Sequence, residues 1–194
     1  MRINVTGNAG AGKSTLSRKI SDALGVPLIE MDRLVWDTGW RRVEPDVWRE
    51  KLSPMLEGES WVVDGVSRSA RYQADLIVFL DYPRHVCAWR CLKRGWRHLL
   101  QSRPGLPENC PEWRIAPTLG TIIMNFPYKA RPIILQDVSE GDSAGIVIKD
   151  LMSLREFETQ IPELPALIDR IRKKRGLLAT NEGAASPCRN MTLT

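Results

Sequence analysis

The chain lacks the features that hold a protein in a membrane or link it by disulfides. No run of apolar residues approaches the ~20 that span a bilayer. Arg2 leads straight into an apolar stretch, which leaves no room for a signal peptide. The four cysteines contain no C-x-x-C pair, and Cys87 and Cys91 are four residues apart in a predicted helix. We expect a cytoplasmic protein without membrane association, zinc or disulfides, in which Cys87 and Cys91 form a buried, reduced pair.

Internal repeats are also absent, and the composition is ordinary. The 194 residues are 43% hydrophobic and 26% charged, which suits one domain with a sizeable core. The net charge of +5 is uneven: residues 84–131 hold nine Lys/Arg and two acids, or +7, and residues 161–194 hold six and three, or +3. Such segments bind nucleic acid or close over a polyphosphate. No helix-turn-helix, zinc finger or stacking platform is visible to favour nucleic acid.

Residues 7–14 follow the pattern G-x-x-x-x-G-K-[ST], which binds nucleotide phosphates when a strand precedes it and a helix follows. The loop consists of Gly7, Asn8, Ala9, Gly10, Ala11, Gly12, Lys13 and Ser14, with Thr15 next in the chain. Residues 2–6 alternate like a strand, and residues 13–24 carry leucine and isoleucine at helical spacing. Glycines let backbone N–H groups turn toward an anion, and the helix N-terminus adds its positive dipole end. We expect Lys13 to reach the β- and γ-phosphates of ATP and the Ser14 hydroxyl to bind Mg²⁺.

Short apolar runs alternate with helical stretches along the chain. Strands are predicted at 2–6, 26–30, 61–64, 76–80 and 145–149, and further helices at about 45–57, 83–101, 128–140 and 153–160. Apolar runs of this kind are typical of buried parallel strands with helices on both faces. The pattern predicts a three-layer α/β fold with right-handed crossovers.

Two segments do not fit this alternation. Residues 31–60 carry three tryptophans, and we interpret them as an acceptor-side insertion. Residues 95–127 carry eight prolines and glycines, too many for one long helix, so we expect an irregular lid. The kinase-like domain would then span residues 1–160. Residues 161–194 would form a basic tail that is disordered over its last part, 182–194.

Acidic residues follow the predicted strands at the edge where ligands bind in such sheets. Asp64 ends an apolar strand and could hold Mg²⁺, or could simply form an Asp-Gly turn. Asp32 could accept a proton from an acceptor hydroxyl, or could cap the next helix. Arg90 and Arg94 share a helix face with Arg97, where they could converge on phosphoryl charge or form a solvated basic face.

The chain resembles adenylate kinases in several short motifs. Residues 61–68, W-V-V-D-G-V-S-R, are similar to the D-G-F-P-R motif of that family, with Val66-Ser67 in place of Phe-Pro. Residues 80–83, L-D-Y-P, followed by two arginines four apart, match its strand, x-P and helix pattern. A closer likeness is to small relatives called DNA topology modulation proteins. These share an acid before a Gly-Trp turn, the W-[IV]-[IV]-D-G run, an A-D-x-[IV] strand (74–77) and an Arg-Pro (131–132) after the lid.

The resemblance covers about residues 1–160 and carries several expectations. It implies a P-loop NTPase fold with a five-stranded parallel sheet in the order 2-3-1-4-5. It makes Arg68 a contact for the acceptor's anionic group, and Arg90 and Arg94 contacts for the ATP phosphates. We accordingly expect an acceptor near Asp32, Arg68 and Arg71.

Together these observations predict an ATP- and Mg²⁺-dependent kinase for a small, nucleotide-like or other acceptor. Lys13, Asp32, Arg90 and Arg94 would carry the catalysis, and Ser14 and Asp64 the metal. One alternative is an ATPase or regulator that acts on DNA topology or on a partner protein, which the basic segments allow. A second is a nucleotide-binding module without turnover, which the intact phosphate loop disfavours.

Overall fold

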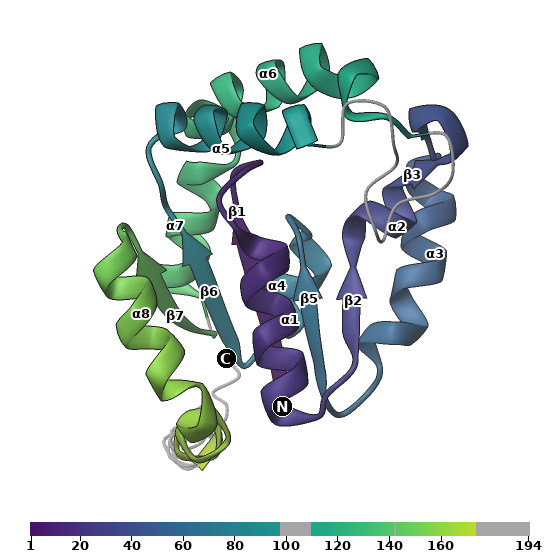
Figure 1. The fold of residues 1–194 in the computed structure, drawn as a ribbon. Coiled ribbons are helices and arrows are strands. Elements are labelled where there is room, and N and C mark those ends of the chain that lie inside the picture. Colours follow the sequence, from purple (N-terminus) through teal and green to yellow (C-terminus); the bar gives the residue numbers. More distant parts are fainter. Residues whose placement is uncertain (98–109, 142, 174–194) are drawn as a thin grey trace, which may run out of the picture.

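The computed structural model describes residues 1–97, 110–141 and 143–173. Its main sheet contains β1 (Arg2–Gly7), β2 (Leu28–Glu30), β5 (Trp61–Asp64), β6 (Leu76–Leu80) and β7 (Ala144–Ile148). All neighbouring strands pair in parallel, in the order β2-β5-β1-β6-β7 (Figure 1). This is the predicted order 2-3-1-4-5. It confirms the α/β fold class. Strands β5 and β6 lie on either side of β1 in the middle of the sheet and are wholly buried, which explains why their sequences are almost entirely apolar.

Helices cover both faces of the sheet and its upper edge (Figure 1). They are α1 (Lys13–Leu24), α2 (Met31–Val35), α3 (Pro45–Leu56), α4 (Arg68–Gln73), α5 (Arg84–Arg97), α6 (Glu112–Lys129), α7 (Arg131–Glu140) and α8 (Leu151–Gln160), followed by the 3₁₀ turn η2 (Ile161–Glu163) and a helical stretch over 164–173. Within residues 31–60, β3 (Trp36–Asp37) and β4 (Arg41–Arg42) form a small hairpin around the 3₁₀ turn η1 (Thr38–Trp40).

Alternate side chains of each strand enter different hydrophobic clusters. Val62 packs in the cluster that contains α1 and α8, whereas Val63 packs in the cluster that contains α3 and α4. Both valines are 0% exposed. Because both faces of these strands are covered by helices, there is no exposed face for polar side chains, and the apolar runs end at the upper edge of the sheet. That edge is where Asp64 and the phosphate loop lie.

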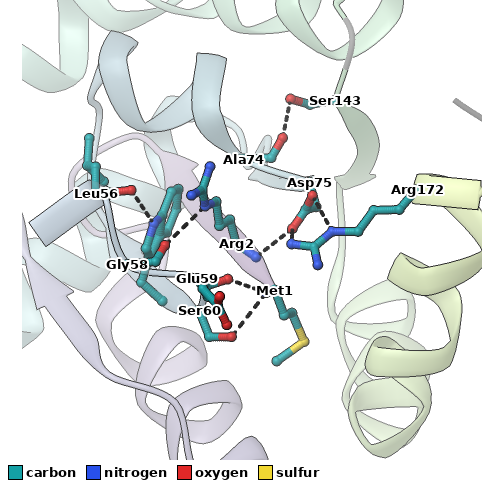
Figure 2. Close-up of polar contacts among 11 residues, drawn as sticks. Met1, Arg2, Leu56, Gly58, Glu59, Ser60, Ala74, Asp75, Ser143 and Arg172 are labelled. Atoms are coloured by element: carbon teal, nitrogen blue, oxygen red, sulfur yellow. Dashed lines mark hydrogen bonds and ion pairs between the residues drawn. The ribbon is translucent and has the colours of Figure 1, made fainter. Parts of the chain in front are cut away.

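The opposite edge of the sheet is closed by an ionic cluster around Asp75 (Figure 2). Its carboxylate accepts the backbone N–H of Arg2 at 2.7 Å and a two-pronged bond from Arg172 at 2.9 and 2.6 Å. The amino group of Met1 donates to the carbonyl of Glu59 at 2.5 Å and to the hydroxyl of Ser60 at 3.0 Å. The Asp of the A-D-x-[IV] motif therefore lies at the base of the sheet, away from the phosphate loop.

The core continues past the domain boundary expected at residue 160. Ile161, Leu164 and Ile168 are buried in the same cluster as the α1 side chains. Helix 164–173 thus belongs to the folded body, because its apolar face covers the sheet and Arg172 ties it to Asp75. The expected disordered segment 182–194 lies outside the described residues.

The structure also differs from the prediction of an irregular lid at residues 95–127. Residues 98–109 lie outside the described residues, but 112–129 form α6, an 18-residue helix that contains Pro117 and Pro127. A proline inside a helix removes one hydrogen bond and does not forbid the helix when packing supports it. Ile115, Ile123 and Phe126 of α6 are themselves buried, and this packing outweighs the helix-breaking signals in the sequence.

Candidate active site

The phosphate loop runs from the end of β1 to the start of α1, as its motif predicts. Gly12 caps α1 with φ 101°, a left-handed conformation that favours glycine. Gly10 has φ 79° and lies against α5, where a Cβ atom would collide with the carbonyl oxygen of Cys87 and lie 2.7 Å from Sγ of Cys91. The glycines thus allow both the turn and the close approach of α5.

Lys13 is held inside the loop. Its Nζ donates to the backbone oxygen of Asn8 at 3.0 Å, and the same oxygen accepts the N–H of Ala11 at 3.2 Å. The ammonium group therefore lies over the loop, where the phosphates of a nucleotide would also lie. A bound phosphate would offer Lys13 a charged partner in place of a carbonyl oxygen, which makes a stronger bond.

Asp64 lies at the end of β5 beside Ser14 and Lys13. The Ser14 hydroxyl lies close enough to this carboxylate to help lower its pKa. Burial raises the pKa of Asp64 above its ordinary value, and the Lys13 charge and the Ser14 hydrogen bond only partly offset this effect. The Oδ1 atom is buried and makes no hydrogen bond within the described part of the chain. A buried carboxylate oxygen without a partner, next to a hydroxyl, is a donor set that suits Mg²⁺.

Helix α5 carries the two predicted phosphate arginines across the upper edge of the sheet (Figure 1). Nη1 of Arg90 donates to the backbone oxygen of Ala11 in the phosphate loop at 3.2 Å. Its guanidinium also lies 4.4 Å from the ring centroid of Tyr82, a cation–π contact. Arg94 follows one turn later and is half-buried. Arg90 therefore contacts the phosphate loop itself, whereas the side chain of Arg97 lies outside the described residues.

The predicted acceptor residues fall into two groups. Asp32, in the first turn of α2, and Arg68, at the start of α4, are exposed at the upper edge. Arg71 is only 5% exposed, and its Nε donates to Asp137 of α7 at 2.6 Å. Arg71 would have to leave this ion pair to contact an acceptor. The reason for the difference is that α7 covers one side of α4 and leaves the other side open.

Two of the three tryptophans in residues 31–60, Trp36 and Trp40, pack against each other and reach the start of α6. The rings of Trp36 and Trp40 meet edge to face at 5.5 Å. Nε1 of Trp40 donates to the carbonyl of Pro111 at 2.8 Å, and Trp40 has a positive φ of 61°. Their positions between the hairpin and α6 favour packing over stacking on a ligand.

The role of Tyr82 was not evident from its sequence pattern, and neither were the ion-pair partners of Glu30, one of the acids at the ends of the predicted strands. Tyr82 supports Arg90 and donates its own hydroxyl to the backbone oxygen of Asp150 at 3.1 Å. Glu30 accepts ion pairs from Arg18 and Arg33 at 2.6 and 2.7 Å, which fixes the end of β2. The tyrosine lies inside the L-D-Y-P motif, so its position before a proline at a strand end was the available signal. The partners of Glu30 had no comparable signal.

The cysteine pair that we expected to be buried is only partly so. Cys87 is buried, Cys91 is half-buried and His85 is exposed, while His98 lies outside the described residues. Burial, together with the neighbouring Cys91, raises the pKa of the Cys87 thiol. Within the described ranges, no three His, Cys, Asp or Glu side chains gather as a metal cluster, and no helix is long and apolar enough to cross a membrane.

No family model matches the chain, and no curated protein matches its sequence. Solved structures do match its fold. A deoxyadenosine kinase from M. mycoides with bound dATP is 15% identical at a TM-score of 0.50, over 87% of this chain and 100% of that one. A shikimate kinase from Acinetobacter baumannii in complex with shikimate is 18% identical at 0.50, over 85% and 92%. A gluconokinase from Sinorhizobium meliloti 1021 is 19% identical at 0.50, over 89% and 96%.

These matches show that the chain has the fold of P-loop kinases. At such identities they show the fold alone. They give no support to the narrower resemblance to DNA topology modulation proteins.

Proposed function

We propose that the protein is a kinase that transfers the γ-phosphoryl group of ATP, as its Mg²⁺ complex, to a small acceptor. The observation that carries this proposal is the meeting of Lys13, Ser14 and Asp64 beside the glycine loop, at the carboxyl edge of the sheet. A chance glycine turn would not bring an ammonium group, a hydroxyl and a buried carboxylate with an unpartnered oxygen to one point.

On the donor side, the loop amides and Lys13 would hold the β- and γ-phosphates. Arg90 and Arg94 would add positive charge where the transferred group develops negative charge. Ser14 and Asp64 would hold Mg²⁺, which would supply positive charge to offset part of the phosphate charge. Helices α5 and α6 would restrict the access of water, which competes with the acceptor for the phosphoryl group.

On the acceptor side, Asp32 would take the proton of the attacking hydroxyl, and Arg68 would bind an anionic group of the acceptor. Both are exposed at the edge that carries the phosphate loop. We assign Arg71 to holding α4 against α7 through Asp137, which keeps Arg68 at the open end of that helix. The likeness to nucleoside, shikimate and gluconate kinases agrees with a small hydroxyl acceptor of this kind.

A screen for acceptor-dependent ADP production tests the proposal. Nucleosides, nucleotides, sugars and small acids are each incubated with ATP, Mg²⁺ and the protein, and Lys13→Ala serves as the control. We expect one class to raise ADP production well above the rate without acceptor. The proposal fails if no compound raises the rate of the parent protein above that of Lys13→Ala.

The alternative of a DNA-acting ATPase is weakened by the positions of its basic residues. Arg90 bonds the phosphate loop, and Arg131 and Arg172 are paired with Asp81 and Asp75, so these three arginines already have partners within the fold. We therefore expect weak binding to duplex DNA, with a steep loss as salt rises. Nanomolar, ATP-dependent DNA binding at physiological salt would favour the alternative.

A further inference from the structure

Helix α6 contains a backbone carbonyl that lacks its usual helical donor. In an α-helix each N–H donates to the carbonyl four residues earlier. Pro127 has no N–H, so the carbonyl of Ile123 lacks the donor that an α-helix normally supplies four residues later. Ile123 is only 4% exposed, and water is not a ready substitute at such a position.

The missing donor comes from the phosphate loop. Nδ2 of Asn8 donates to the carbonyl oxygen of Ile123 at 3.2 Å. Asn8 is 1% exposed, and its Oδ1 accepts the N–H of Ala9 at 2.8 Å. The side chain thus spans from the loop to α6, more than a hundred residues along the chain, and both of its polar atoms are used. Its backbone oxygen is the acceptor for Lys13.

We propose that Asn8 is a positioning residue that seats α6 on the phosphate loop, and that Pro127 supplies the matching acceptor. Because Pro127 supplies no intrahelical donor, the Ile123 carbonyl can accept the hydrogen bond from Asn8. The proline thereby helps to fix α6 to the phosphate loop. The hydrogen bond between Asn8 and Ile123 holds α6 over the loop. It also fixes the loop conformation in which the Asn8 backbone oxygen accepts a hydrogen bond from Lys13. Its effect on nucleotide binding rests on the proposed function, whereas the contact itself does not.

A double-mutant cycle tests the pairing without any nucleotide. Asn8→Ala leaves the buried carbonyl without a donor, and we expect the melting temperature to fall by about 2–4 °C or more. In a Pro127→Ala background the helix supplies its own N–H to Ile123, so the same Asn8→Ala change should lower it by much less. Pro117→Ala is the matched control, because Pro117 is the other proline inside α6 and Asn8 does not bond near it.

Additive effects of Asn8→Ala and Pro127→Ala would overturn the pairing, and so would equal coupling of Asn8 to Pro117 and Pro127. Non-additivity for Pro127 alone supports it. Both outcomes are independent of ATP, so they remain informative even if no acceptor is ever found.

A second measurement separates positioning from ordinary stabilisation. The double variant Asn8→Ala with Pro127→Ala regains stability but still lacks the bond between loop and helix. We expect its α6 amides to exchange hydrogen faster than those of the parent, and its Kd for Mg·ATP to be about threefold to tenfold higher. Recovery of amide protection and of ATP affinity along with the melting temperature would show that Asn8 only stabilises the core. If the parent protein binds no ATP, the proposed function fails, and amide exchange alone decides the positioning role.

Discussion

Arg131 and Asp81 form a two-pronged ion pair that closes the base of the α5–α6 insertion. Nε and Nη2 of Arg131 each lie 2.8 Å from a different oxygen of Asp81. Asp81 directly follows β6, where the insertion leaves the sheet, and Arg131 starts α7, where the chain returns. The carboxylate is 9% exposed and the guanidinium 41%. One contact between residues 50 apart thus joins both ends of the helical cover over the phosphate loop.

Replacing Arg131 tests this closure. Arg131→Lys keeps the charge but loses the planar fork, and we expect a loss of about 1 kcal/mol in the free energy of unfolding. Arg131→Ala also leaves the Asp81 carboxylate without its partner, and we expect a loss of about 2 kcal/mol. Urea denaturation measures both. Arg84→Ala, at the exposed start of α5, is the control, and equal losses for all three variants would contradict a specific role for the pair.

Nucleotide binding should depend on the loop lysine. ATP or GTP with Mg²⁺ should raise the melting temperature, because a ligand that binds only the folded state stabilises it. Lys13→Ala should lose most of this increase while its own melting temperature without nucleotide stays close to that of the parent. Equal nucleotide-induced shifts in the two proteins would refute the phosphate-loop assignment.

We expect Asp64 to act in turnover through the metal ion. In the ligand-free protein, its ionised carboxylate should lower the free energy of unfolding. We expect Asp64→Asn to lower Mg²⁺-dependent turnover at least tenfold and to spare metal-free nucleotide binding. Because burial raises the pKa of Asp64 in the folded protein, the ionised carboxylate destabilises the ligand-free fold at neutral pH.

The ligand-free Asp64→Asn variant should therefore be more stable than the parent at pH 7. This advantage should shrink as the pH falls through the raised pKa and vanish below the ordinary value, since both folded and unfolded carboxyls are then protonated. Thermal melts from pH 7 to pH 3 measure it. An advantage that grows as the pH falls would contradict the sign of the shift.

Asp75 should show the opposite pH dependence. Burial by itself raises its pKa, but the hydrogen bonds from Arg172 and the Arg2 N–H and the charge of Arg172 outweigh burial and leave the pKa below its ordinary value. Its contribution is then present above the unfolded pKa and lost as the pH falls through the lowered folded value. We expect Asp75→Asn to cost about 1–3 kcal/mol at pH 7, because Arg172 is partly exposed, and progressively less in acid.

Acid titration of unfolding, compared between the parent and Asp75→Asn, provides the measurement. Asp46→Asn is a suitable control, because Asp46 pairs with Arg49 at the exposed start of α3. A cost of Asp75→Asn that stays constant down to pH 2 would show that the ion pair is not its source.

Arg90 should be the more sensitive of the α5 arginines. It touches the loop at Ala11 and is held against Tyr82, so its guanidinium is already placed for phosphoryl charge. We expect Arg90→Ala to lower kcat/KM by about 10³ or more in the presence of a cognate acceptor. Tyr82→Phe keeps the ring and should lose little. Steady-state kinetics decide this, and a purely electrostatic surface effect would appear instead as an equal, salt-sensitive loss for Arg84→Ala.

Much of the fold was predictable because its signals are local. An apolar run covered on both faces, a glycine loop between strand and helix, and an Asp at a strand end each need only a few neighbouring residues. For this reason, the five strands, the start of α1 at Lys13 and the position of Asp64 agree with their predictions.

Other features depended on contacts between residues far apart in the chain. Arg68 and Arg71 look equivalent in sequence, yet α7 covers only Arg71, because Asp137 lies beside it in space. The prolines of residues 95–127 predicted an irregular lid, but α6 persists through Pro127. It persists because buried side chains hold the helix and Asn8 bonds the carbonyl whose usual helical donor the proline removes. Local pattern thus determined where strands, loop and acids lie, whereas the assignment of each arginine and proline to structure or site was decided by tertiary packing.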